Sequence, residues 1–148
     1  MSAYQTIVVG TDGSESSLKA VDRAGALGAG AGAKVIIACA YFPNERGVGE
    51  VSDVLKDEAY QVQGSSPTEE ILRTAKERAQ RAGATTIDAR SVKGAPVDAL
   101  LQLVSDSRAD LLVVGNKGLN SIAGRLLGSV PADVARKSAC DVLIVHTT

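Results

Sequence analysis

With 148 residues and 45% apolar side chains, the chain is long enough to fold as one domain around its own core, without disulfides or a structural metal. A net charge of −1 and the lack of a basic cluster argue against nucleic-acid binding through a broad electrostatic patch. The N-terminus lacks a signal-peptide pattern and no apolar run is long enough to span a bilayer, so we expect a cytoplasmic protein without a membrane partner.

Short apolar runs, each a predicted strand, alternate with segments that have the apolar period of a helix. In chain order these are a strand at 6–9, a helix at 14–30, a strand at 34–40, a helix from Pro67, a strand at 85–92, a helix opened by 94–96, a strand at 111–114, a helix at 129–137 and a strand at 142–145. Strands separated by helices predict an α/β fold with a parallel sheet and right-handed crossovers.

Some local signals sharpen these boundaries. Ser66 has the chemistry of an N-cap, with Pro67 at the first helical position and Glu69 completing a capping box, and Gly83 suits the position after that helix. Residues 41–65 are the hardest to interpret, with at most a short helix over 51–60. The glycines between Gly25 and Gly32 are expected to weaken the first helix.

The two cysteines stand far apart, in strand-like runs. We therefore expect Cys39 and Cys140 to be buried, reduced thiols, since free cysteine is among the residues most often buried.

The segment from Gly115 to Ser129 has the composition of a phosphate-binding loop. It follows a strongly apolar strand and leads into a helix, and glycines there let backbone N–H groups approach phosphate oxygens. Ser129 offers a hydroxyl at the start of the helix, and Lys117 or Arg125 would balance the charge. The segment has neither the Walker A spacing nor the glycine fingerprint of dinucleotide-binding folds.

The spacing Gly115-x2-Gly118-x9-Gly128-Ser129 resembles the nucleotide loop of universal stress proteins. Residues 8–14, 110–115 and 141–145 are similar to that family's first, fourth and last strands, so the resemblance covers nearly all of 1–148 as one domain. It implies a doubly wound five-stranded parallel sheet in the order 3-2-1-4-5, with helices on both faces.

The resemblance also implies roles for particular residues. Asp12 would lie near the ribose or a metal ion, the backbone near Ala40 would contact adenine, and the glycine loop with Ser129 would hold phosphates. The full predicted nucleotide-binding set is Gly10, Thr11, Asp12, Ala40, Gly115, Asn116, Lys117, Gly118, Arg125, Gly128, Ser129 and Val130. No residue is predicted to be catalytic, and none is predicted to be a metal ligand of the protein itself.

Other interpretations of these residues stay open at this point. The three glycines would also suit a plain strand-to-helix turn, and Asp12 or Ser129 would also suit a helix cap. The ligand is expected to be ATP, with or without Mg²⁺, or cyclic AMP instead. A slow ATPase or a self-phosphorylating protein is the enzymatic alternative, although no general base is placed beside the loop.

The last strand and the residue after it, Asp141–His146, would form an apolar sheet edge. Proteins normally cover such edges. Together with the resemblance, this predicts a homodimer that pairs through this strand.

Overall fold

The computed structural model describes residues 3–41, 65–117 and 130–147. Within them lies one parallel sheet of five strands, in the order β3-β2-β1-β4-β5. The strands are β1 (Thr6–Gly10), β2 (Lys34–Tyr41), β3 (Ile87–Lys93), β4 (Leu111–Gly115) and β5 (Asp141–Val145). The predicted fold class and strand order are confirmed.

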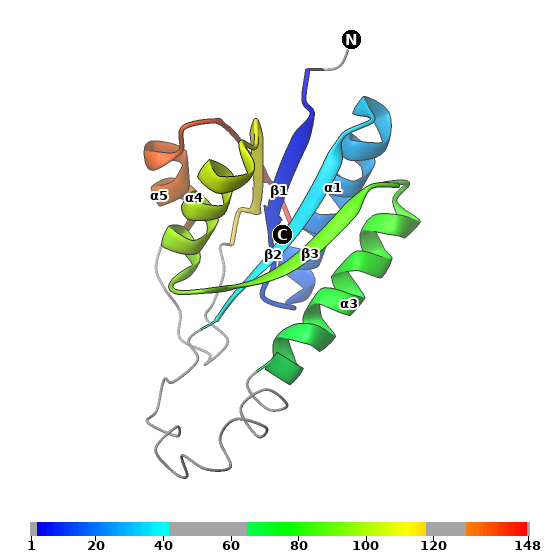
Figure 1. Ribbon diagram of the computed structural model, residues 1–148, viewed down its shortest axis with the longest axis horizontal. Coiled ribbons are helices and arrows are strands. Elements are labelled where there is room, and N and C mark those ends of the chain that lie inside the picture. Colours follow the sequence, from blue (N-terminus) through cyan, green and yellow to red (C-terminus); the bar gives the residue numbers. More distant parts are fainter. Residues whose placement is uncertain (1–2, 42–64, 118–129, 148) are drawn as a thin grey trace.

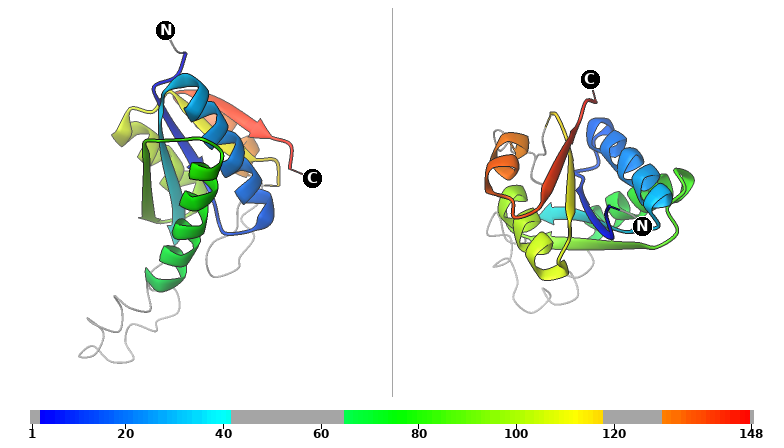
Figure 2. Two further views of the ribbon diagram at one scale, coloured as in Figure 1. Left: turned by 90° about the vertical axis from the view of Figure 1, so that its right-hand side faces the viewer. Right: turned by 90° about the horizontal axis from the view of Figure 1, so that it is seen from above.

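Helices cover both faces of the sheet (Figures 1 and 2). Helices α1 (Glu15–Ala31) and α3 (Ser65–Arg81) lie on one face, and α4 (Pro96–Ser107) and α5 (Val130–Lys137) lie on the other. Strand side chains point alternately to the two sides, so that Ile7 and Val9 pack beneath α1 while Val8 packs in the cluster beneath α4 and α5. The sheet therefore separates two hydrophobic cores.

Within the described part of the chain, no helix has the length and apolar character needed to cross a membrane.

The start of α3 differs from the prediction. The helix begins at Ser65, so Ser66 is already helical and Pro67 is the third helical residue rather than the first. A proline is tolerated there because the N–H groups of the first turn have no partner within the helix. The end of α3 agrees with the prediction: Gly83 has a φ of 117°, and the N–H of Ala84 donates to the carbonyl of Ala79 at 3.1 Å.

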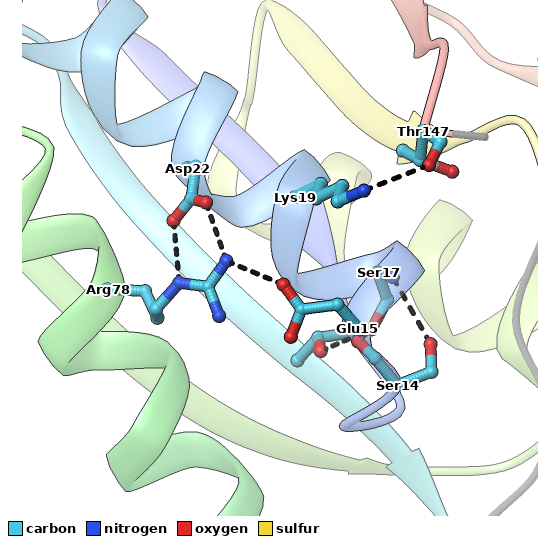
Figure 3. A network of polar contacts seen from close by, with 8 residues as sticks. Ser14, Glu15, Ser17, Lys19, Asp22, Arg78 and Thr147 are labelled. Atoms are coloured by element: carbon cyan, nitrogen blue, oxygen red, sulfur yellow. Dashed lines mark hydrogen bonds and ion pairs between the residues drawn. The ribbon is translucent and has the colours of Figure 1, made fainter.

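A guanidinium joins α1 to α3 (Figure 3). Arg78 of α3 makes two bonds to the Asp22 carboxylate, Nε to Oδ1 at 2.9 Å and Nη2 to Oδ2 at 2.6 Å, and a third to Glu15 at 3.2 Å. These carboxylates raise the pKa of Arg78 above its usual range. The contact fixes the position of the first half of α1, whose N-terminus borders the site described next.

Candidate functional site

The carboxyl ends of β1 and β4 lie side by side in the middle of the sheet, since Val9 is in register with Val113. The chain leaves β1 toward α1 on one face, whereas β4 is followed by α5 on the other face. Such a divergence opens a crevice at the carboxyl edge of a parallel sheet, which is where α/β proteins bind ligands. Gly10 and Gly115, the last residues of the two strands, are both buried.

A hydroxyl network shapes the turn after β1. The N–H of Thr11 donates to the carbonyl of Ala38 at 2.9 Å, which anchors the turn to β2. The hydroxyls of Thr11 and Ser17 lie 2.8 Å apart in a buried contact. Each also accepts a backbone N–H, Thr11 from Gly13 at 3.1 Å and Ser17 from Asp12 at 3.2 Å. Side chains therefore hold the backbone on either side of Asp12.

The Asp12 carboxylate shapes this turn but is not the helix cap. Its Oδ1 accepts the N–H of Ser14 at 2.9 Å. The N-cap of α1 is Ser14, whose hydroxyl accepts the N–H of Ser17 at 3.1 Å (Figure 3). The cap role that the sequence left open for Asp12 therefore belongs to Ser14, and Asp12 is half-buried just beyond the end of β1.

The end of β2 lies beside the end of β1, since Ala38 is in register with Gly10. Ala40 is half-buried there, in register with Val92 of β3. Cys39 just before it is fully buried on the α1 side of the sheet. Burial raises the pKa of the Cys39 thiol to about 12, and the negative charge of Asp12 adds to the shift. The predicted burial holds for Cys39, whereas Cys140 is only half-buried; both are free thiols.

The glycine at the end of β4 lets Thr147 and the start of α1 pack closely against the strand. A Cβ on Gly115 would lie 3.3 Å from the methyl group of Thr147 and 3.5 Å from the carbonyl oxygen of Ser16. The next residue, Asn116, donates its N–H to Val145 of β5 at 2.8 Å. Asn116 and Lys117 are both exposed.

Thr147 contacts Ser16 and Asn116 beside the candidate site, and the sequence analysis did not predict this position. It is 6% exposed, and its carbonyl accepts a bond from Lys19 of α1 at 3.4 Å (Figure 3). No local pattern marks a threonine beyond the last strand, because its partners lie elsewhere in the chain. The hydroxyl network around Asp12 had a visible signal, the run Ser14-Glu-Ser-Ser17 directly after a turn.

Comparison with known proteins fixes the family. The family model described as the universal stress protein family matches residues 3–146. The chain belongs to the universal stress protein family. A universal stress protein of Mycobacterium tuberculosis strain H37Rv is 61% identical over 148 residues, covering 100% of both chains. One from Thermus aquaticus is 30% identical and covers 97% of this chain and 99% of its own.

Solved structures of universal stress proteins share the fold. One, crystallised in complex with cAMP, is 58% identical, covers 99% of this chain and 100% of its own, and superposes with a TM-score of 0.78. A second, from Archaeoglobus fulgidus in complex with dAMP, covers 95% of this chain and 97% of its own with a TM-score of 0.70. At 21% identity, that second likeness concerns the fold alone.

Part of the predicted loop falls outside the description. Gly118, Arg125, Gly128 and Ser129 lie beyond the described residues, so their predicted roles stay predictions. Val130, the first residue of α5, is fully buried in the core on that face. The nucleotide contact predicted for Val130 stays a prediction.

Proposed function

We propose that this universal stress protein binds an adenine nucleotide in the crevice between the carboxyl ends of β1 and β4. One observation carries the proposal: a carboxylate, Asp12, is held on a hydrogen-bonded turn where the carboxyl ends of β1 and β4 lie side by side. The cAMP complex of a relative that is 58% identical over nearly the whole chain supports the choice of ligand.

The proposed roles follow from the chemistry of the ligand. A carboxylate accepts hydrogen bonds from ribose hydroxyls, and Asp12 lies at the crevice to do so. The backbone of Ala40, at the end of β2, would contact the adenine edge. Phosphate oxygens would meet the backbone around Gly115–Lys117 and, beyond the described residues, the loop that ends at Ser129, followed by the N–H of Val130. Gly10 and Thr11 set the backbone path that leads to Asp12.

Cyclic AMP and ATP place different demands on this site. Cyclic AMP carries a single phosphate charge and keeps only the 2′-hydroxyl free for Asp12, and the relative's complex favours it. ATP carries three phosphates and would bring Mg²⁺ bound to its own phosphate oxygens. The resemblance of Gly115–Ser129 to the nucleotide loop of the family supports it as the other candidate. The proposed function is nucleotide binding without turnover. The alternative, slow ATP hydrolysis, is tested by measuring phosphate release from ATP.

Calorimetric titration of the wild-type protein tests the proposal. We expect saturable one-site binding of cyclic AMP, and of ATP with a Mg²⁺-dependent affinity. Cyclic GMP and GTP, which share the sugar and phosphates, serve as controls for recognition of the base. The proposal fails if none of the adenine nucleotides binds, or if the guanine nucleotides bind as tightly.

A matched pair of variants tests whether the ligand contacts Asp12. Asp12→Ala removes both the charge and the acceptor, and should weaken binding about 10- to 150-fold, which corresponds to roughly 1.5–3 kcal/mol for a charged hydrogen bond. Asp12→Asn keeps an oxygen that can accept the Ser14 N–H, so the turn should persist while the charge is lost. An intermediate affinity is expected for this variant.

Asp106, an exposed carboxylate near the end of α4, provides the control, and Asp106→Ala should bind as the wild type does. An Asp12→Ala protein with a lower melting temperature but unchanged affinity would limit Asp12 to a structural role.

A further inference from the structure

A buried threonine beyond the last strand joins two parts of the molecule that are far apart in sequence. Thr147 donates its N–H and its hydroxyl to the same atom, Oδ1 of Asn116, each at 2.8 Å. The Thr147 hydroxyl also lies 2.6 Å from that of Ser16 in α1, which is 131 positions away. We call these three side chains the Thr147 latch.

The hydrogens in the latch have a single consistent arrangement. Because the backbone N–H of Thr147 must donate, its partner on Asn116 is the carbonyl oxygen, which only accepts. The one hydroxyl hydrogen of Thr147 therefore goes to Asn116, and Ser16 donates its own to Thr147. The chain of hydrogen bonds therefore runs from Ser16 in α1 through Thr147 to Asn116, the residue after β4.

The latch connects the two sides of the proposed nucleotide crevice. Ser16 lies in the first turn of α1, beside Ser17, which accepts the N–H of Asp12. Asn116 directly follows Gly115, and the Thr147 methyl lies 3.3 Å from where a Cβ on Gly115 would be. Thr147 thus contacts α1, which follows the Asp12 turn, through Ser16. It contacts the segment after β4, where the phosphates are proposed to bind, through Asn116.

We propose that Thr147 is a positioning residue, which fixes the Asp12 turn relative to the backbone at Gly115–Lys117 before a nucleotide binds. This inference rests on the proposed nucleotide site. A buried polar group is costly unless it is bonded, so the closed latch holds both sides in one arrangement. A site held in its binding geometry in advance loses less free energy on ordering when the ligand arrives.

Two substitutions at Thr147 separate the contribution of the hydroxyl to nucleotide binding from that of the methyl group. Thr147→Val keeps the shape and breaks the bond chain, and should weaken nucleotide binding about three- to tenfold in a protein that stays folded. Thr147→Ser keeps the hydroxyl and loses the methyl, and should bind within about twofold of the wild type. Thr85→Val, at an exposed threonine before β3, is the control for the same chemical change.

Ser16→Ala breaks the same bond chain from its other end. The Ser16→Ala, Thr147→Val double variant should therefore lose no more affinity than either single variant, because the two side chains act as one unit. Independent, additive losses would overturn the latch as a unit. Unchanged affinity in a folded Thr147→Val protein would reduce Thr147 to a structural role.

Amide hydrogen exchange tests the latch in the ligand-free protein, whatever the nucleotide titrations show. In Thr147→Val, exchange should accelerate about three- to tenfold at Asp12 and Gly13 on one side and at Asn116 on the other, while β3 amides keep their rates. Failure of the wild type to bind nucleotides would refute the proposed function, whereas unchanged exchange on both sides would refute the latch by itself.

Discussion

Cys39 is a thiol whose environment predicts a measurable pH dependence. Its pKa rises to about 12 because it is buried and, secondarily, because Asp12 is negative, whereas an ordinary thiol titrates near 9.0. Between these values the folded state keeps a proton that the unfolded state has lost. Stability should therefore be unaffected by this group below pH 9 and should fall as pH rises toward 12.

Urea unfolding from pH 8 to 11 measures this contribution. Relative to Cys39→Ala, the wild type should lose up to about 1.4 kcal/mol of unfolding free energy per pH unit above pH 9. Cys140→Ala, at the half-exposed cysteine, retains Cys39 and should follow the wild-type slope. Parallel curves for the wild type and Cys39→Ala would show that the folded state does not protect this proton.

For single residues, the sequence predicts where a residue lies in the fold better than it predicts the hydrogen-bond partner of its side chain. Asp12 lies where a strand meets a turn, and that placement follows from a local pattern. The division of roles between Asp12 and Ser14 does not, because both are good caps by chemistry and only the geometry assigns the bond. Thr147 was unpredictable for a different reason: its partner Ser16 lies 131 positions away, and no periodicity encodes such a contact.

Two glycines of α1 that look alike in sequence have opposite roles in the structure. A Cβ on Gly25 would lie 2.9 Å from the carbonyl oxygen of Ala79 in α3, whereas one on Gly30 would meet nothing within 4 Å. Gly25→Ala should therefore destabilise the fold by about 1–3 kcal/mol through helix displacement, despite the better helix propensity of alanine. Gly30→Ala should stabilise it by up to about 1 kcal/mol.

Chemical denaturation of the two single variants decides between these effects. If both variants are stabilised, helix propensity alone governs α1 and the close approach to α3 is unimportant.

The same contrast explains what the sequence did not predict, since all the glycines from Gly25 onward were expected to weaken the helix. Periodicity located α1 and all five strands, but it does not reveal which glycines a neighbouring helix requires.

At the scale of the whole molecule, the two edges of the sheet differ in chemistry. The β3 edge carries exposed Arg90 and Lys93, which discourage pairing with another chain. The β5 edge carries Ile144, which at 43% is the most exposed large hydrophobic residue of the described chain. If the chain forms the homodimer predicted from the sequence, which stays a prediction, this asymmetry favours β5 over β3 as the pairing edge.

Sedimentation velocity at micromolar concentration tests the dimer. The wild type should sediment as a dimer, and Ile144→Lys should shift it to a monomer because a charge would be buried at the new interface. Ser91→Lys, an exposed position on the β3 edge, should leave the dimer intact. A monomeric wild type, or a dimeric Ile144→Lys protein, would contradict this assignment of the interface.

The position of β1 at the centre of the sheet has a consequence for synthesis of the chain. Strand β1 is made first, and one of its neighbours, β2, follows soon after. The other, β4, comes much later: Asp110, just before it, accepts the N–H of Thr6 across 104 positions. At about 5–20 residues per second, a ribosome takes roughly 5–20 s to cover that stretch. During this interval the nascent chain carries an apolar strand with one open edge, so its vulnerable period for aggregation ends only when β4 emerges.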